Sequence, residues 1–427
     1  MILRCGLCGV LAVLLGLVVD CDRASGGQAV ARSDPALDRR VAELLPGIEE
    51  LSRVSAEREL EVRVASAATL EAYLIDRLDS EYPGDTLKNL KLAYAAFGLI
   101  PDTVDLRALL VDLLLEQTVG YYDPARDVLF IREEVSPEER DAVLAHELVH
   151  GLQDQKTDLD VLLRQGGNDA RTAAQAAVEG HATVVMLAHA LSQATGAPAT
   201  VERLPELNPD MAGLMFNTSS MPRFAQAPAI IRETLIFPYL GGARYVQRLW
   251  KSQAGQPLPF GEWLPESTEQ LLHTERLLTE RDRPSPLVIS EPGGGWEVRY
   301  ARDLGELEIR IYFEEHLGDK GAAAQAAAGW DGDAYMLISR GDQLALVWYT
   351  VWDSESDAAE FARAHREAFE ARFGPLTSTG ELIARERQAR VSRLTISGMP
   401  AVLVVETPRG VDVDPVPEAA VEREHRP

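Results

Sequence analysis

Cysteine is scarce in this chain of 427 residues, and its three copies, Cys5, Cys8 and Cys21, all lie close to the N-terminus. The body of the sequence therefore has no disulfide framework, and its stability has to come from packing. Basic residues are also few, since 42 lysines and arginines stand against 67 acidic residues, a formal net charge of −25. Nucleic-acid phosphates are bound by clustered basic side chains, so this charge argues against a nucleic-acid partner.

Long apolar runs are absent except at the N-terminus, where residues 5–19 follow Arg4 and end at a charged segment. Fifteen residues cross the hydrocarbon core of a bilayer poorly, whereas a short apolar run behind a basic residue is typical of a secretory signal. We therefore predict a signal peptide over residues 1–26. The protein is then exported to the periplasm, the extracellular space or the membrane surface.

The position of Cys21 directly after the apolar run resembles the lipid-acceptor cysteine of a bacterial lipoprotein. A lipid on Cys21 would attach the protein to a membrane. Asp20, however, occupies the position where lipoprotein signals carry a small residue, so cleavage further on, near Gly26 or Ala31, is the alternative.

The motif that carries chemistry is His146-Glu147-Leu148-Val149-His150, an HExxH pattern. Residues four apart lie one above the other on a helix, so His146 and His150 can hold one metal ion while Glu147 acts on metal-bound water. The pattern predicts a zinc site with Glu147 as the general base.

The residues before the motif predict the helix that this geometry needs. Ser136 can serve as the N-cap, and Pro137 suits the first helical position. Glu139, three residues after Ser136, completes the pattern of a capping box. Leucines recur at helical spacing through the motif, so one side of the helix can be buried beside the histidines.

A catalytic zinc takes three protein ligands and keeps one position for water. We predict Glu179 as the third ligand, because it lies on a following alanine-rich helix that can pack closely against the first. His181 and His189 are the alternative third ligands. Asp154, four residues after His150, is either an orienting partner for a histidine ring or an exposed charge.

A family resemblance is carried by Gly120-Tyr121-Tyr122-Asp123-Pro124, by the run from His146 to Gln155 and by Val178-Glu179-Gly180. These segments resemble an exported bacterial family of HExxH zinc metallopeptidase-like proteins of gluzincin type, most of them uncharacterised. The resemblance implies Glu179 as third ligand and a peptide or protein substrate. Thr183 departs from the pattern, because thermolysin-like gluzincins have an aspartate at this position that supports a histidine ligand.

The mechanism expected of such a site is proton abstraction from water by Glu147, followed by proton delivery to the leaving amine. A further donor has to stabilise the oxyanion, and Tyr239 and His273 are the candidates, since a phenol or an imidazolium can donate a hydrogen bond to it. Alternatively, Tyr239 is a core residue and His273 braces a helix.

With 427 residues, 46% of them hydrophobic, the chain is long enough to form two or three domains, each with its own hydrophobic core. Helical periodicity predicts an N-terminal helical region over residues 27–118. Residues 119–282 form the zinc-binding catalytic region, opening with a β-hairpin at 121–132 and closing with a helix at 263–278. A proline- and glycine-rich linker over residues 283–296 then marks a domain boundary.

Beyond the linker we predict a C-terminal α+β domain over residues 297–410 and a flexible tail over 411–427. Its expected helices are 305–316, 322–328 and 354–373, and its expected strands are 334–338, 345–352, 393–396 and 401–405. The predicted fold class is thus α+β, with a mainly helical gluzincin-like metallopeptidase core, a small sheet or hairpin, and this second domain.

The function predicted from the sequence is that of an exported zinc-dependent peptidase. The alternative from another class is a non-catalytic envelope or lipoprotein-type binding protein in which zinc merely fixes two helices together.

Overall fold

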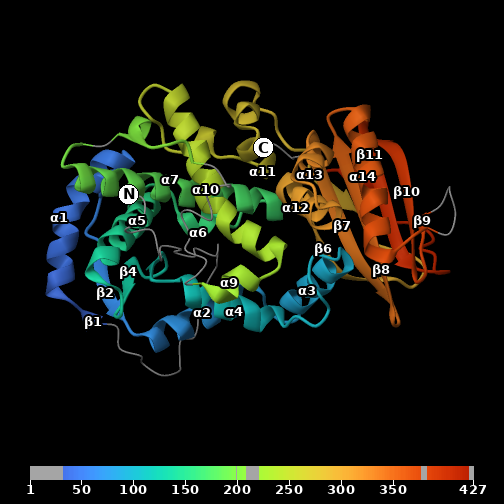
Figure 1. Ribbon diagram of the computed structural model, residues 1–427, viewed down its shortest axis with the longest axis horizontal. Helices are drawn as coiled ribbons and strands as arrows, with labels where there is room; N and C mark the ends of the chain where they lie inside the picture. The colour runs from blue at the N-terminus through green and yellow to red at the C-terminus, as the bar shows by residue number, and fades with distance from the viewer. Residues whose placement is uncertain (1–31, 199, 208–220, 377–381, 423–427) are drawn as a thin grey trace.

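The computed structural model describes residues 32–198, 200–207, 221–376 and 382–422. The predicted signal peptide, with Cys21, lies outside these residues. Within them the protein has an α+β fold, as the sequence predicts. Figure 1 shows a mainly helical part at one end of the molecule and a large sheet covered by helices at the other.

The N-terminal part is helical but also contributes strands to a sheet of order β1-β2-β4-β3. Its helices are α1 (Pro35–Ser52), α2 (Ala67–Glu81), α3 (Thr86–Ala96) and α4 (Leu106–Gln117), and its strands are β1 (Arg32–Ser33) and β2 (Glu61–Ala65). The helical prediction missed β2, although Glu61-Val62-Arg63-Val64 alternates polar and apolar residues as a strand does. Val62 and Val64 are buried where β2 pairs in parallel with β4.

The hairpin predicted at residues 121–132 is present as β3 (Gly120–Asp123) and β4 (Val128–Arg132). It leads into α5 (Pro137–Lys156), whose first turn is capped by the Ser136 hydroxyl accepting from the Glu139 amide. The predicted N-cap is therefore confirmed, while the Glu139 carboxylate accepts from the Ser136 hydroxyl, at 2.8 Å, in place of the backbone N–H of a full capping box.

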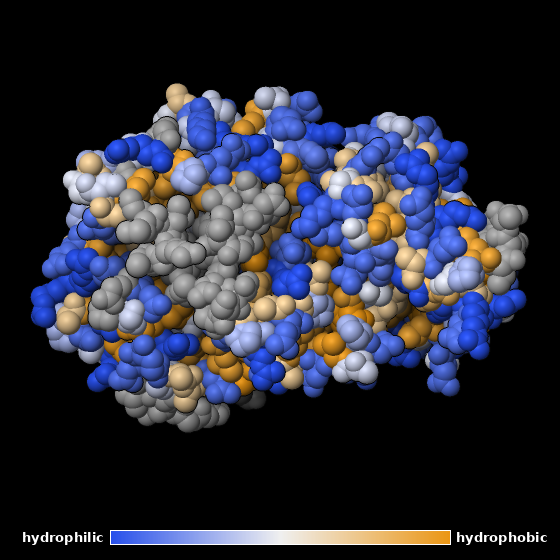
Figure 2. Space-filling model, in the orientation of Figure 1, coloured by the Kyte–Doolittle hydropathy of each residue, from blue (hydrophilic) through white to orange (hydrophobic). Residues whose placement is uncertain are grey.

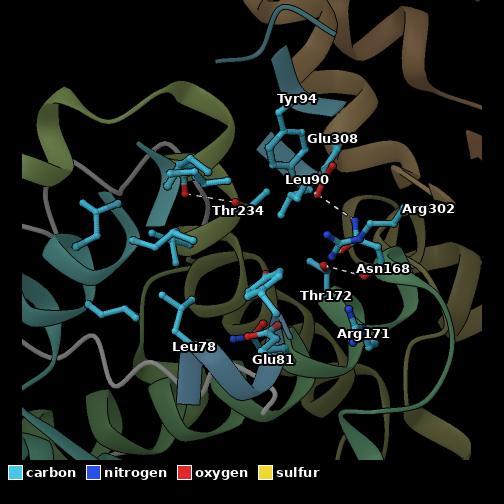
Figure 3. A pocket seen from close by; sticks show the side chains of 18 of the residues that line it. Leu78, Glu81, Leu90, Tyr94, Asn168, Arg171, Thr172, Thr234, Arg302 and Glu308 are labelled. Atoms are coloured by element: carbon cyan, nitrogen blue, oxygen red, sulfur yellow. Dashed lines mark hydrogen bonds between the residues drawn. The ribbon is translucent and has the colours of Figure 1, made fainter. Parts of the chain in front are cut away.

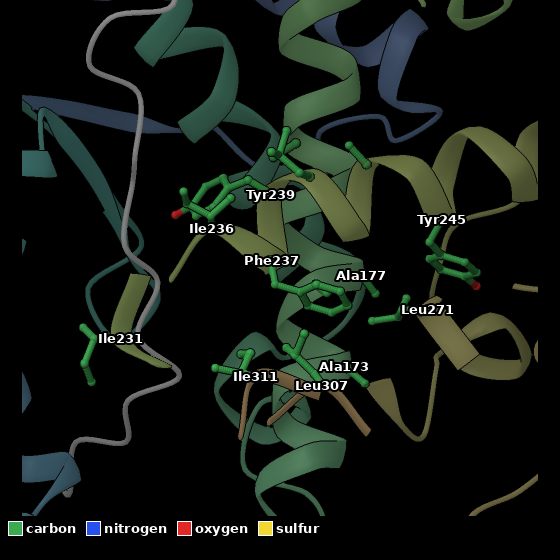
Figure 4. Packing of buried hydrophobic residues seen from close by; sticks show 14 of the residues in the cluster. Ala173, Ala177, Ile231, Ile236, Phe237, Tyr239, Tyr245, Leu271, Leu307 and Ile311 are labelled. Atoms are coloured by element: carbon green, nitrogen blue, oxygen red, sulfur yellow. The ribbon is translucent and has the colours of Figure 1, made fainter. Parts of the chain in front are cut away.

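Two long helices then cross each other, α7 (Asn168–Thr195) and α10 (Ala229–Ser252). The short helix α6 (Leu159–Leu162) precedes α7 in the chain, and the short helix α9 (Pro222–Gln226) precedes α10. Gly180 and Gly242 let the two backbones touch, because a β-carbon at Gly242 would overlap the carbonyl oxygen of Ala176. Figure 4 shows Phe237 of α10 reaching towards Ala177 of α7 beside this crossing.

The single helix expected at residues 263–278 is broken into a 3-10 turn (Gly261–Trp263), α11 (Thr268–Leu272) and a π-helical turn (Arg276–Glu280). Pro265 lies between the first two pieces, and Ser267 caps α11 by accepting from the Gln270 amide. These local signals outweigh the apolar periodicity that suggested one helix.

The C-terminal part contains a six-stranded sheet of order β6-β7-β8-β11-β10-β9. The strands are β6 (Glu297–Arg302), β7 (Trp330–Arg340), β8 (Gln343–Trp352), β9 (Leu382–Ile383), β10 (Arg387–Ile396) and β11 (Met399–Pro408). The helices are α12 (Gly305–Leu317), α13 (Lys320–Ala327) and α14 (Glu355–Phe373). Every helix and strand expected between residues 305 and 405 is present, and most of the strands are longer than predicted.

The two faces of this sheet belong to two different cores, as the alternation of strand residues requires. Leu337, Trp348 and Val404 face the helices and join the main core, which also contains residues of the N-terminal helices. Phe97 packs edge-on against Trp348, with ring centroids 5.2 Å apart. The N-terminal and C-terminal parts therefore share one core.

The other face is covered by a two-stranded sheet of β5 (Leu287–Ile289) and β12 (Ala419–Val421). Both strands of this small sheet fall in regions for which the sequence predicts a linker and a flexible tail. The region predicted as a linker contains β5, and the region predicted as a flexible tail contains β12 and the buried Val413. The apolar residues on these strands cover a sheet face that would otherwise be exposed, which offsets the glycines and prolines around them.

No helix in the described part of the chain is long and apolar enough to cross a membrane. The face drawn in Figure 2 is mostly hydrophilic, with hydrophobic residues scattered across it. Large hydrophobic side chains that are well exposed are few among the described residues, and Val161 and Val288 are about half exposed.

Candidate metal centre

The structure brings His146, His150 and Glu179 together, two from α5 and one from α7. The Nε2 atoms of the two histidines are 3.0 Å apart, and Glu179 Oε2 lies 3.1 Å from His146 Nε2 and 3.4 Å from His150 Nε2. Three ligands of one tetrahedral zinc at about 2.0–2.1 Å are separated by roughly 3.3 Å. The three atoms therefore have the spacing of a zinc-binding set.

The charges within the cluster also fit a cation. Burial works against a charge on His150, but Glu179, Glu147 and the hydrogen bond to Gln153 together outweigh burial and raise the pKa of His150 to about 9. The pKa of Glu179 is lowered in turn by His150 and His146, although burial opposes this. A proton thus occupies a place that a metal ion could take, because metal binding displaces protons from its ligands.

Glu147 follows His146 on α5, and its side chain is fully buried. Neither of its carboxylate oxygens has a side-chain partner among the described residues. Burial, assisted by the charge of Glu179, raises the pKa of Glu147 to about 8, and the positive charge at His150 opposes the rise. This buried carboxylate has a backbone hydrogen bond with Tyr122, but its burial is still costly, and a nearby cation would offset that cost.

Tyr239 of α10 lies at the cluster. Its ring stacks on that of His146, with centroids 6.1 Å apart, and its hydroxyl is hydrogen-bonded to Glu179. Burial, reinforced by Glu179 and Glu147, raises the pKa of Tyr239 well above its ordinary value, so the phenol keeps its proton. The close crossing at Gly180 and Gly242 holds α10 near enough for these contacts.

The contacts of His273 are with α12 and not with the cluster. It follows the last residue of α11, and its Nε2 lies 2.8 Å from Glu306 Oε1 of α12. That hydrogen bond raises the pKa of His273, and the other charges acting on it are those of Glu275 and Arg276. His273 braces two helices, which was the alternative reading of its sequence position.

The alternative third ligands also point elsewhere. His181 Nε2 donates to the carbonyl oxygen of Ser52, 3.0 Å away, and its Nδ1 faces Gln153. Burial lowers the pKa of His181 to about 4, so the ring is neutral. Burial also lowers the pKa of His189, and the charges acting on that ring are those of Asp141 and Arg40 rather than the cluster.

Asp154 matches neither alternative, because its partners are neither a histidine ring nor solvent alone. Its carboxylate accepts hydrogen bonds from the Tyr122 hydroxyl, at 2.9 Å, and from the Leu159 amide, at 3.0 Å. The residue that contacts a ligand ring is Gln153, whose Oε1 lies 2.8 Å from His150 Nδ1. Its spacing, three residues after His150, could have identified it, because residues three apart share a helix face.

A cavity of about 140 Å³ adjoins Tyr239. One wall follows α7 through Asn168, Arg171, Thr172 and Gln175, and Gln175 precedes Glu179 by about one helical turn. Leucines from the N-terminal helices line another side. Figure 3 shows Arg171, Arg302 and Glu308 gathered at one side of the cavity.

A second acidic group, Glu269, Asp282 and Asp353, also has the spacing of metal ligands. Arg276 already fills it, pairing with Asp282 and, at 2.8 Å, with Asp353. Arg276 therefore offsets part of the negative charge of this group.

Comparison with known proteins finds similarity to a domain of unknown function, DUF8575, over residues 297–416. No curated protein and no solved structure matches the chain. The matched residues begin with β6 and contain the six-stranded sheet with its helices, and they leave the metal cluster outside. The match to this domain of unknown function therefore concerns the C-terminal part of the chain.

Proposed function

We propose that this protein is an exported zinc-dependent peptidase with a gluzincin-type core, in which His146, His150 and Glu179 hold the ion. The observation that carries the proposal is the convergence of three ligand atoms from two helices, 3.0–3.4 Å apart. Among the described residues, the cluster has no fourth histidine, cysteine or carboxylate. Three protein ligands and one position for water are the pattern of catalytic zinc sites.

Zinc bound here would supply Lewis-acid activation of water and of the scissile carbonyl. Glu147 takes the proton of the attacking water and delivers it to the leaving amine. Its pKa of about 8 in the metal-free cluster is close to the operating range of a general base, and a neighbouring cation lowers it further.

Tyr239 is the proposed oxyanion donor. Its hydroxyl keeps its proton and already contacts Glu179, one of the ligands. A phenol at this place can turn its hydrogen bond to the charge that develops on the carbonyl oxygen during attack.

The cavity beside Tyr239 offers room for part of a peptide substrate. Its leucine-lined side favours an apolar side chain, while Arg171 and Arg302 lie at its polar side. Export, with membrane attachment through a lipid on Cys21 as one form of it, remains part of the proposal on the strength of the N-terminal sequence.

A second function is favoured by one observation, the complete burial of the side chains of His146, Glu147, His150 and Glu179. Buried ligands suit a zinc ion that only ties α5 to α7 in a non-catalytic envelope protein. The two functions differ in the role of Glu147, which is needed for peptide cleavage but not for holding the ion.

The test uses the zinc-loaded full-length protein, the variant Glu147→Gln and the control Asp154→Asn, incubated with a mixed peptide library. We expect the wild type and the control to cleave peptides, and a chelator to abolish cleavage. Glu147→Gln should retain one zinc per chain and lose activity by about 10²- to 10⁴-fold, the usual contribution of a general base. Zinc binding without cleavage by the wild type would favour the structural role.

A further inference from the structure

His150 is held in one tautomer by Gln153. The two atoms in contact are His150 Nδ1 and Gln153 Oε1, 2.8 Å apart. An amide oxygen only accepts hydrogen bonds, so Nδ1 has to carry the proton. The lone pair available for a metal is then on His150 Nε2, the atom that faces His146 and Glu179.

The amide of Gln153 has one orientation only. Its Nε2 donates to the carbonyl oxygen of Val178 and to Nδ1 of His181, both 3.0 Å away. Rotating the amide by 180° would place its oxygen against the Val178 carbonyl, two acceptors in contact without a proton between them. The oxygen therefore stays directed at His150.

His181 completes the chain of hydrogen bonds. Because Nδ1 accepts from Gln153, Nε2 carries the proton and donates to the carbonyl oxygen of Ser52, 3.0 Å away, where α1 ends. Its ring is packed edge-on against Trp250 and Phe260, with centroids 5.6 Å and 6.3 Å away. Neither the position nor the tautomer of His181 is left free.

We propose that Gln153 is a positioning residue for the metal ligand His150 and that His181 holds Gln153 in place. The hydrogen bonds run in one direction, from the ligand ring through the Gln153 amide and the His181 ring to the backbone of Ser52. They join α5, α7 and α1 through side chains that are fully buried. The inference rests on the proposed metal site and adds to it the residues that set its geometry.

The chemical consequence concerns the charge of the site. Histidine ligands commonly donate their second N–H to a carboxylate, and Gln153 replaces that carboxylate by a neutral amide. The three ligands and a divalent zinc then carry one net positive charge between them, before the carboxylate of Glu147 is counted. That charge favours ionisation of bound water more than a site with a second carboxylate would.

A purely structural role for Gln153 makes a different prediction. Buried polar groups are paired in most proteins, so loss of any such glutamine destabilises the fold. Gln155 is the matched control, because it lies on the same helix and both its amide oxygen and its amide nitrogen are hydrogen-bonded. Its Oε1 accepts from the amides of Glu57 and Arg58, and its Nε2 donates to the Arg58 carbonyl, none of them at the metal site.

The experiment measures zinc affinity by competition with a chromophoric chelator for the wild type, Gln153→Ala, Gln153→Glu and Gln155→Ala. Stability is measured in parallel by denaturation of the metal-free proteins. We expect Gln153→Ala to bind zinc about 10- to 100-fold more weakly, the usual effect of removing a partner of a ligand. Gln155→Ala should lose stability but keep its zinc affinity.

Gln153→Glu keeps an acceptor for His150 and loses the donors to Val178 and His181. It should therefore recover most of the zinc affinity while remaining less stable than the wild type. Equal zinc affinity of Gln153→Ala and Gln155→Ala would overturn the inference. If the wild type binds no zinc, both the proposed function and this inference fail. If the wild type binds zinc and the Gln153 variants bind it equally well, only the inference fails.

A second measurement needs no variant. In the zinc-loaded wild type with ¹⁵N-labelled histidine, long-range ¹⁵N–¹H NMR correlations should identify His150 as protonated at Nδ1 and His181 as protonated at Nε2. The opposite tautomer at either ring would contradict the relay, even if every Gln153 variant failed to fold.

Discussion

Replacing Gly242 by alanine should damage both the stability of the protein and its metal centre. The added β-carbon would overlap the carbonyl oxygen of Ala176, well inside the 3.0 Å limit that β-carbons respect. The neighbour is backbone, so no rotamer change can relieve the overlap, and α10 has to move away from α7. Overpacking by one methyl group usually costs about 1–3 kcal/mol, and we expect the upper end of this range or more.

The displacement of α10 should also affect the metal centre. Tyr239 lies on α10 and contacts Glu179, the residue next to Gly180 on α7. If α10 moves away from α7, the distance between Tyr239 and Glu179 increases, and the third metal ligand loses its hydrogen bond to Tyr239. Gly242→Ala should therefore also bind zinc more weakly.

The control for this prediction is Gly47→Ala. Gly47 lies within α1, and a β-carbon there meets no atom within 4 Å. Alanine in a helix interior is about 0.5–1 kcal/mol more favourable than glycine, so this variant should gain stability. Urea denaturation followed by circular dichroism measures both. Gly242→Ala as stable as the wild type would refute the close helix crossing.

Three further predictions concern charge and metal. Burial alone would raise the pKa of Glu406, but Arg372 and His365 lower it to about 2. The ionised carboxylate therefore stabilises the fold at pH values above its ordinary pKa. This contribution is lost as the pH falls from about 4.5 towards 2. Glu406→Gln leaves the buried Arg372 without its partner and should cost about 3–5 kcal/mol at neutral pH, and a denaturation midpoint unchanged from the wild type would be inconsistent with this pair. Free zinc at 100 times its dissociation constant should stabilise the protein by about 2.7 kcal/mol in calorimetry, with no effect on His150→Ala. Zinc should bind more tightly as the pH rises towards 9, because the proton on His150 competes with the ion, and a flat pH profile by calorimetric titration would contradict that.

Local sequence signals predicted much of the structure. The Ser136 cap, the periodicity of α5 and the Asp123–Pro124 turn depend on neighbours in the chain, and each is found where expected. Glu179 lies beside the two histidines, as predicted, because an alanine-rich helix with Gly180 can approach another helix closely.

The misses depend on partners distant in sequence. Paired residues of β5 and β12 are 130 or more positions apart in the sequence, and neither segment is a strand without the other or without the sheet face they cover. The spacing of Gln153 from His150 is a local signal, but its second partner, His181, becomes a neighbour only when α5 and α7 pack. His273 was assigned by residue type, and its hydrogen bond to Glu306 depends on where α12 lies.

The central claim is that one cation is held between α5 and α7. It is tested most directly by anomalous diffraction at the zinc edge from crystals of the zinc-loaded protein. The account predicts one strong peak about 2.0–2.1 Å from Nε2 of both His146 and His150 and at a similar distance from a Glu179 oxygen. A protein saturated with zinc but without a peak among these three side chains would contradict it.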